Sequence, residues 1–480
     1  MPKRLITISG KDWMKGFSIQ KSFPIGGIFS EMTNFDPFER MGFLQPARVP
    51  TRYANATITK TIRYMTGMDI SGPFIIGFAD GGGATALYKI NAITGAATDE
   101  VASITSATNA RGLLFAKNRL LYANPTAIRS VSATLTGDAS VLTGLTDGEH
   151  PMVMGADLNI YGVDGGAAAN QIFRIADASS TSGNSLNVFA LETGMFIRSI
   201  KNDGRHLVMV ADNRQTSSSG IGNYDCCVAY WNYADETLVA RYSLKDSGMF
   251  AVEIDDDGSI LVFGGNNIYV SNVVTQPTPI FSFKGDTPIT SKPGGSPWVI
   301  KKNSSVLWGD SGGSKIHGYG NQVVGQKKVF FAPYDTGDTS ITAIVENAGQ
   351  VWAATDTPAL YGFWDTATAR ATASLVTAPI LFDRVYKITN FRVVTRAILA
   401  SGETVSVEIL KQGGGAIISD QQDFTFAANG AKQVRIFGID PGTNTTPNCQ
   451  EIDEIQIDTN ACIESIEIWG EEIPWNNQEL

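Results

Sequence analysis

Residues 250–265 read FAVEIDDDGSILVFGG: a run of β-forming residues, a polar turn, and a second β-forming run. The same pattern recurs along the chain, and a looser copy, TIRYMTGMDISGPFIIGFAD, occupies residues 61–80. The turns of these copies follow one another at intervals of 39–54 residues, with a mean of 46. The other clear copies are GLLFAKNRLLYAN (112–124), PMVMGADLNIYGV (151–163), IRSIKNDGRHLVMVAD (197–212), WVIKKNSSVLWGD (298–310) and ITAIVENAGQVWAATD (341–356).

A period near 46 built from short strands is typical of a β-propeller, whose blades take about 40–50 residues each. Each copy continues with a third β-forming run, such as ALYKI (86–90) or NIYVS (267–271), and most add a fourth, such as LVARYSL (238–244). Four strands make one blade. The sequence therefore predicts an all-β protein with a seven-bladed propeller over residues 53–375, and six blades are the alternative because the first copy is the weakest.

The C-terminal part, residues 376–480, has a different pattern. Its β-forming runs alternate between apolar and polar residues, which indicates strands with one buried face. It holds seven Lys/Arg against 15 Asp/Glu, so this end of the chain is acidic. We expect a β-sandwich followed by a short tail. The apolar positions that define the alternation are Val405, Val407 and Ile409, then Ile452, Ile455 and Ile457, then Ile463, Ile466 and Ile468.

The N-terminal part, residues 1–52, has no repeat, and its prolines disfavour regular elements. It is rich in phenylalanine, and residues 1–64 carry a net charge of +6 on a chain whose total is −10. This composition predicts an extended basic strap that docks on an acidic surface, such as the body of a neighbouring copy. The residues expected to make that assembly contact are Phe29, Phe35, Phe38, Arg40, Phe43 and Arg48.

A resemblance bears on function. Residues 34–46 read NFDPFERMGFLQP. This run, ahead of a propeller and a C-terminal sandwich, resembles virion proteins of tailed bacteriophages, and is similar to the tail nozzle and tail accessory propellers of short-tailed phages. The resemblance implies a homo-oligomeric ring, commonly of six copies, that assembles in the host cytoplasm with other tail proteins and contacts DNA as it leaves. It implies no catalytic residues. The alternatives are an interaction propeller outside phages, and a glycan-binding or glycan-active propeller.

The sequence raises an enzymatic hypothesis as well, because residues 309–313, GDSGG, match the string around the nucleophile of chymotrypsin-like proteases. The repeats place this string in the loop between the second and third strands of the sixth blade, where sibling blades carry glycine-rich turns. We therefore expect Ser311 to be a turn residue and His317 to be a propeller core residue. The other histidines, His150 and His206, lie in an inter-blade loop and a second strand. We predict no enzyme, no cofactor and no metal site.

Several further patterns favour a structural interpretation. The aspartates at 255–257 align with a plain turn of the fourth blade and lack the spaced ligands of a calcium loop. The four cysteines have no C-x-x-C spacing and are expected to be buried thiols, with a bridge between Cys449 and Cys462 left open. The net charge of −10 argues against general nucleic-acid binding. No apolar run reaches the roughly 18 residues of a membrane helix.

Overall fold

The computed structural model describes residues 3–9, 29–36, 44–53, 57–69, 72–214, 224–282, 297–302, 304–310, 312–321, 328–363, 370–377, 379–397, 402–411, 415–426, 432–438 and 448–473. The chain forms two compact units. One unit comprises residues 50–316 and 336–363, and the other comprises residues 1–49, 317–335 and 364–480. Ser311, Phe38, Arg40 and Phe43 lie outside the described residues.

Seven four-stranded antiparallel sheets form the blades of a propeller. The first blade contains β4 (Thr61–Asp69), β5 (Pro73–Gly81), β6 (Ala84–Asn91) and β7 (Ala97–Asp99), and the second contains β8 (Gly112–Ala116), β9 (Arg119–Asn124), β10 (Ala127–Ser132) and β11 (Ala139–Thr143). The third blade contains β12 (Met152–Met154), β13 (Ile160–Val163), β14 (Gln171–Ile175) and β15 (Ser185–Ala190). The fourth contains β16 (Phe196–Asn202), β17 (Leu207–Asp212), β18 (Tyr224–Asn232) and β19 (Thr237–Asp246). Two short 3₁₀ helices, η1 (Val101–Ser103) and η2 (Gly166–Ala168), lie in loops.

The remaining blades follow the same plan. The fifth blade contains β20 (Met249–Ile254), β21 (Ile260–Gly264), β22 (Asn267–Ser271) and β23 (Thr278–Ser282). The sixth contains β24 (Val299–Lys302), β25 (Ser305–Gly309), β26 (Lys315–Gly320) and β27 (Val329–Asp335). The seventh contains β28 (Ile341–Asn347), β29 (Gln350–Thr355), β30 (Leu360–Phe363) and β3 (Thr51–Tyr53). The seven predicted blades and their third strands are thus confirmed, and six blades are excluded. A fourth strand follows the third in six of the blades, as predicted for most copies.

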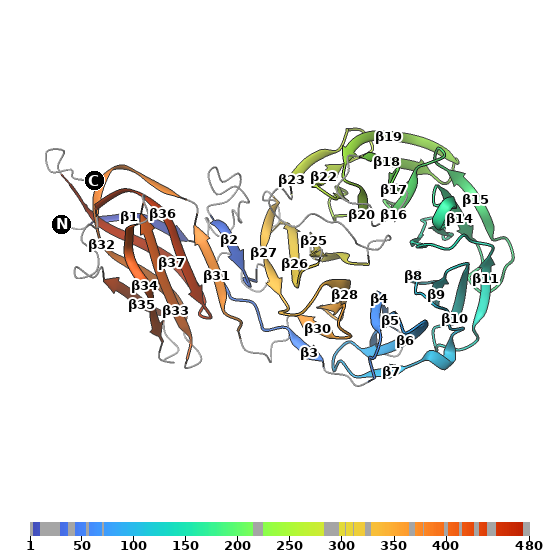
Figure 1. Cartoon of the computed structure of the whole chain (residues 1–480), viewed down its shortest axis with the longest axis horizontal. Helices are drawn as coiled ribbons and strands as arrows, with labels where there is room; N and C mark the ends of the chain where they lie inside the picture. Colours follow the sequence, from blue (N-terminus) through green and yellow to red (C-terminus); the bar gives the residue numbers. More distant parts are fainter. Residues whose placement is uncertain are drawn as a thin grey trace. The chain divides into compact units, whose positions relative to one another are not determined.

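The ring closes in two ways. The first strand of each blade contacts the first strand of the next blade, and β28 of the last blade contacts β4 of the first. These first strands therefore surround the centre of the ring. The strands at the outside are β7, β11, β15, β19 and β23 (Figure 1). In addition, β3 pairs with β30, so that an N-terminal strand is the outer strand of the seventh blade. The ring of Tyr53 packs against Trp352 with 4.9 Å between centroids. The expected boundary at residue 53 is therefore wrong, because the propeller begins with the strand that completes its last blade.

The second unit contains a β-sandwich whose two layers are joined by pairing between β32 (Ile380–Ala397) and β36 (Asn448–Thr459). One layer has the order β2 (Phe29–Thr33), β31 (Ala373–Thr377), β36, β33 (Thr404–Lys411) and β34 (Gly415–Thr425). The other has the order β1 (Lys3–Ser9), β37 (Ile463–Glu472), β32 and β35 (Lys432–Gly438). The nine residues whose alternation predicted the sandwich are all fully buried in its core.

The N-terminal segment is part of this unit's fold, and this corrects the expectation of a separate strap. Strand β1 pairs with β37 and β2 pairs with β31. Phe35 is buried in the sandwich core, so its ring is not available to a neighbouring subunit. Arg48 is partly exposed and forms an isolated bridge with Arg370. The backbone of Phe29 lies in β2, and its side chain lies outside the described residues.

The GDSGG string begins at the last residue of β25 and runs into the connection to β26. Gly312 has a φ of +75°, in the left-handed region that glycine adopts readily, which agrees with the expected role of the glycines. His317 on β26 is only partly buried, whereas Tyr88 and Phe173 at the aligned positions are fully buried. The expectation of a core imidazole at His317 is therefore wrong: the buried positions of β26 are Ile316, Gly318 and Gly320, so the strand places His317 on its other face.

Candidate functional site

The innermost strands share an irregularity at the end where the chain enters them. The pairing register shifts by one residue at Arg63 in β4, Arg198 in β16, Phe250 in β20 and Thr342 in β28. A β-bulge of this kind adds an unpaired residue, bends the strand and redirects the side chain. Four blades therefore present a redirected side chain at the same place, on one rim of the ring.

In two blades the redirected residue is an arginine, and each pairs with an aspartate at the end of the second strand. Arg63 Nε lies 3.0 Å from Asp80 Oδ1, and Arg198 Nη2 lies 2.8 Å from Asp212 Oδ1. The second oxygen of each carboxylate accepts the main-chain N–H that leads into the next blade: Asp80 Oδ2 from Ala110 at 3.1 Å, and Asp212 Oδ2 from Met249 at 2.8 Å. We call this Arg–Asp–amide arrangement the inter-blade latch.

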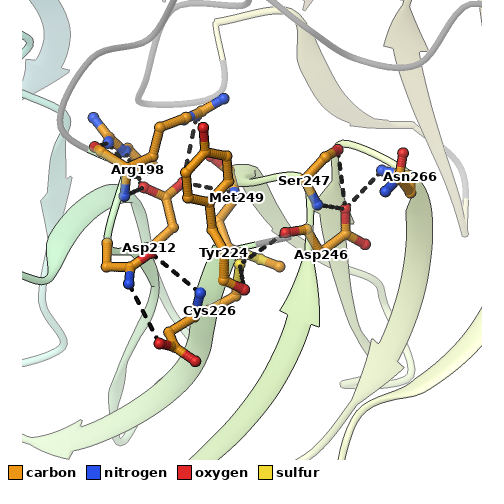
Figure 2. Close-up of polar contacts among 11 residues, drawn as sticks. Arg198, Asp212, Tyr224, Cys226, Asp246, Ser247, Met249 and Asn266 are labelled. Atoms are coloured by element: carbon orange, nitrogen blue, oxygen red, sulfur yellow. Dashed lines mark hydrogen bonds and ion pairs between the residues drawn. The ribbon is translucent and has the colours of Figure 1, made fainter. Parts of the chain in front are cut away.

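The latch between the fourth and fifth blades, drawn in Figure 2, is the more buried of the two. Asp212 has no exposed surface, and its Oδ1 also accepts the N–H of Arg214 at 3.1 Å. The Arg214 guanidinium, only 2% exposed, lies 3.4 Å from Asp212 Oδ2 and 4.4 Å from the centroid of the Phe250 ring. Burial lowers the pKa of Arg214, and the Asp212 charge opposes this shift. Gly248 lies beside it with a φ of +135°, a conformation that favours glycine, and a Cβ there would lie 2.7 Å from Arg214 Cζ.

A second aspartate, Asp246, is the last residue of β19 and lies in the same inter-blade region (Figure 2). Its Oδ1 accepts the N–H groups of Ser247 at 2.6 Å and Asn266 at 2.7 Å. Its Oδ2 accepts Asn267 Nδ2 at 3.0 Å and the Tyr269 hydroxyl at 2.7 Å. Each oxygen thus already accepts at least two hydrogen bonds, as in a fully saturated carboxylate. Asp246 and Asp212 therefore act as structural anchors, and neither is free to act as a general base or a metal ligand.

The rim at the first three blades has a different composition. Glu149, in the linker before β12, accepts a hydrogen bond from the Tyr64 hydroxyl of the first blade and lies 3.3 Å from Arg111 Nη1 of the second. Burial raises the pKa of Glu149 to about 8, and the charge of Arg63 opposes that shift only in part. Part of the side chain is still exposed. Tyr64, Arg111 and Glu149 thus form a polar trio that links the first three blades at this rim.

His150, the next residue, shows why this trio is not extended into a catalytic array. Its ring is fully buried, with Nδ1 3.1 Å from the Val163 carbonyl oxygen and Nε2 3.1 Å from that of Pro125. Both ring nitrogens thus face main-chain oxygens, and neither faces Glu149. Burial lowers the pKa of His150 although the two carbonyl contacts favour its protonation. The imidazole therefore connects the second blade, through Pro125, to the third blade, through Val163.

The protease hypothesis gains no support from the described residues. His206 Nδ1 lies 2.9 Å from Asp203 Oδ2, three residues earlier, and its ring packs edge-on to Tyr230. This is a local turn contact in the fourth blade, whereas the GDSGG loop belongs to the sixth blade. The predicted turn of the fifth blade is confirmed: Asp257 Oδ1 accepts the N–H of Ser259 at 2.9 Å, as in an Asx turn.

The cysteines of the fourth blade also have the predicted character. Cys226 and Cys227 are buried, and burial raises the pKa of their thiols to about 12 and about 11. Such thiols are poor nucleophiles at neutral pH. The side chain of Cys449 lies outside the described residues.

Within the described part of the chain, no three His, Cys, Asp or Glu side chains are grouped as metal ligands would be. No helix among those residues has the length and apolar character of a membrane span.

Sequence reasoning did not find the latch or the Glu149 trio. A signal for the latch was present, because an aspartate follows or ends the second strand in five copies: Asp80, Asp164, Asp212, Asp310 and Asp356. The trio left no such signal, since its members come from three blades and from linkers of unequal length.

Comparison with known proteins adds little beyond the fold. No protein-family model and no curated protein matches the sequence. Among solved structures, the chain is similar to the WD40 β-propeller domain of Doa1, with 10% identity, a TM-score of 0.48, and coverage of 67% of this chain and 98% of that one. It is also similar to the extracellular domain of BT3049 from B. thetaiotaomicron, with 12% identity, a TM-score of 0.48, and coverage of 86% and 57%. The blade count rests on the strand pairing described above.

Proposed function

We propose that the chain is a non-catalytic structural protein of the tail of a tailed bacteriophage, part of a homo-oligomeric ring at the tail nozzle or an accessory ring through which DNA leaves. The proposal depends on the resemblance carried by residues 34–46. It also agrees with the use of the propeller's buried charges as anchors between blades.

The observation that carries the proposal is the way the two ends of that segment are held. Asn34 donates its N–H to the Pro333 carbonyl at 2.8 Å and accepts the N–H of Asp335 on its Oδ1 at 2.9 Å. Asp36 donates its N–H to the Gln45 carbonyl at 2.8 Å, and Phe35 bridges to Pro46. The two described ends of this segment, residues 34–36 and 44–46, are thus held next to each other. A chain connection whose ends are fixed on a scaffold is a suitable place for a contact between subunits.

Two measurements test the proposal. Mass spectrometry of purified phage particles from a strain that carries the gene should detect this chain in stoichiometric amount with tail proteins. Negative-stain microscopy of the purified protein should show rings of several copies. A chain that is absent from the particles and encoded away from tail genes is not a virion protein, and the interaction-propeller alternative then stands.

A further inference from the structure

The outer face of the β1-β37-β32-β35 layer carries an ordered array of side chains. Cross-strand pairing places Thr7, Glu467, Arg392 and Ile436 in one row. The adjacent row contains Ser9, Ser465, Val394 and Val434. A depression of about 640 Å³ is lined by the residues of these two rows except Ile436, and Arg4, Lys432 and Glu464 complete its lining. That volume is within the range of small-ligand sites.

The charges of this depression do not cancel. Glu467 is occupied on both oxygens, Oε1 by Arg4 Nη1 at 3.2 Å and Oε2 by the Trp469 indole N–H at 3.0 Å. Lys432 pairs with Glu464 at 2.6 Å. Arg392 lies directly across from Glu467 in the sheet, yet it makes no ion pair among the described residues. The depression is therefore left with one uncompensated positive charge, on a chain whose net charge is −10.

The Arg392 guanidinium is held in place although it lacks a counter-ion. Its Nε donates to Asn390 Oδ1 at 3.2 Å, and its Cζ lies 4.0 Å from the centroid of the Trp469 ring. These two contacts leave its terminal Nη groups without a hydrogen-bond partner among the described residues. A planar guanidinium fixed at Nε and stacked on an indole is arranged for paired hydrogen bonds with a carboxylate.

The rest of the depression indicates what carries that carboxylate. Hydroxyl groups of Thr7, Ser9 and Ser465 lie along one side. Val434 and Ile436, 55% and 48% exposed, present an apolar surface in the same rows, beyond Arg392 and Val394. A sugar ring has hydroxyl groups at its edge and an apolar C–H face, so it matches both surfaces. An extended acidic peptide would gain little from three hydroxyl groups, and the carboxylates beyond the one bound by Arg392 would meet Glu464 and Glu467.

We propose that this depression binds a carboxylated sugar, such as a uronic acid unit of a polysaccharide, through a two-point contact of its carboxylate with Arg392. This site does not depend on the tail role proposed above, because it is formed by residues of the sandwich alone.

Isothermal titration of the full chain with a glucuronate-containing oligosaccharide, against its neutral glucose counterpart, tests the proposal. The acidic sugar should bind and the neutral one should not. Arg392→Gln should weaken binding at least about tenfold, the effect of losing a charge-assisted pair. Arg384→Gln is the matched control, since Arg384 is an exposed arginine of the same β32 strand paired with Glu472 outside the depression, and it should leave binding unchanged.

A gain of affinity provides an independent check. Glu467→Gln removes one of the two carboxylates beside the ligand, so it should strengthen binding of the acidic sugar, and its melting profile should show that the sandwich is still folded. Equal binding of the neutral sugar, binding that survives Arg392→Gln, or no binding of the acidic sugar would each overturn the proposal. So would an acidic peptide that binds through Arg392 where the acidic sugar does not, because the depression would then be a protein-docking site.

Discussion

Replacing Asp212 by asparagine removes one charge from the latch between the fourth and fifth blades and keeps the shape of the side chain. The buried Arg214 guanidinium then loses its counter-ion, and Arg198 loses a carboxylate that it contacts through both Nε, at 3.1 Å, and Nη2, at 2.8 Å. The asparagine NH₂ group must also face either Arg198 or the Met249 N–H, which are both donors. Breaking a buried ion pair from one side costs about 3–5 kcal/mol.

That cost is a large share of the roughly 5–15 kcal/mol that holds a typical domain folded. At about 2–4 °C for each kcal/mol, the propeller transition of Asp212→Asn should fall by at least about 6 °C in differential scanning calorimetry. Asp225→Asn is the control, because Asp225 and its partner Lys245 are 63% and 60% exposed, and such surface pairs contribute about 1 kcal/mol or less.

A second substitution separates the charge from the hydrogen bonds. Arg214→Met in the Asp212→Asn background removes the stranded cation and places an apolar side chain against Phe250, so it should recover part of the lost stability. The reasoning is refuted if Asp212→Asn and Asp225→Asn have the same effect, or if the added Arg214→Met lowers stability further.

One deletion and two substitutions probe the ring and the sandwich. Deleting residues 1–53 should lower the melting temperature of the propeller in calorimetry, since blade seven loses its outer strand; unchanged melting would show that β3 is dispensable. Phe35→Ala should destabilise the sandwich by about 3–5 kcal/mol in urea unfolding, the usual cost of truncating a buried phenylalanine, and an effect on assembly alone would contradict the burial of this ring. Because the folded-state pKa of His150 is depressed, its contribution to stability is present above the unfolded pKa of about 6.5 and is lost as pH falls through the folded value. His150→Gln should therefore reduce the loss of stability between pH 7 and pH 5, measured by urea unfolding, and an identical pH profile would refute the assignment.

The blade repeats were predictable from the sequence because each blade is built from neighbours in the chain. A β-run, a turn and a second β-run within about 16 residues, as in 250–265, identify a hairpin without any knowledge of the rest. The strand at Thr51–Tyr53 could not be found in this way, since its partner is β30 and three residues contain no period. For the same reason the N-terminal segment read as a strap, although β1 and β2 belong to the sandwich.

The candidate sites were missed for a different reason, because they depend on register. A bulge shifts which side chain faces the next blade, and nothing in the letters around Arg63 or Arg198 marks one. His317 shows the same limit. Its strand was predicted correctly, yet the side chain was predicted to lie on the buried face of that strand and it lies on the opposite face. Period-2 reasoning gives the alternation along a strand and leaves its phase open where glycines replace the apolar residues.

Arg198 and Arg392 differ in whether their guanidinium groups are paired with a carboxylate within the fold. Both arginines lie on strands and are held by neighbours, but Arg198 bonds the buried Asp212, whereas the carboxylate opposite Arg392 is already occupied by Arg4 and Trp469. A buried charge must be paired within the fold, because the cost of leaving it unpaired is several kcal/mol. A partly exposed charge can be left to solvent, and so to a ligand. The propeller latch therefore uses its charges to join blades, and the outer face of the sandwich is where a described arginine retains the hydrogen-bonding groups that an acidic ligand requires.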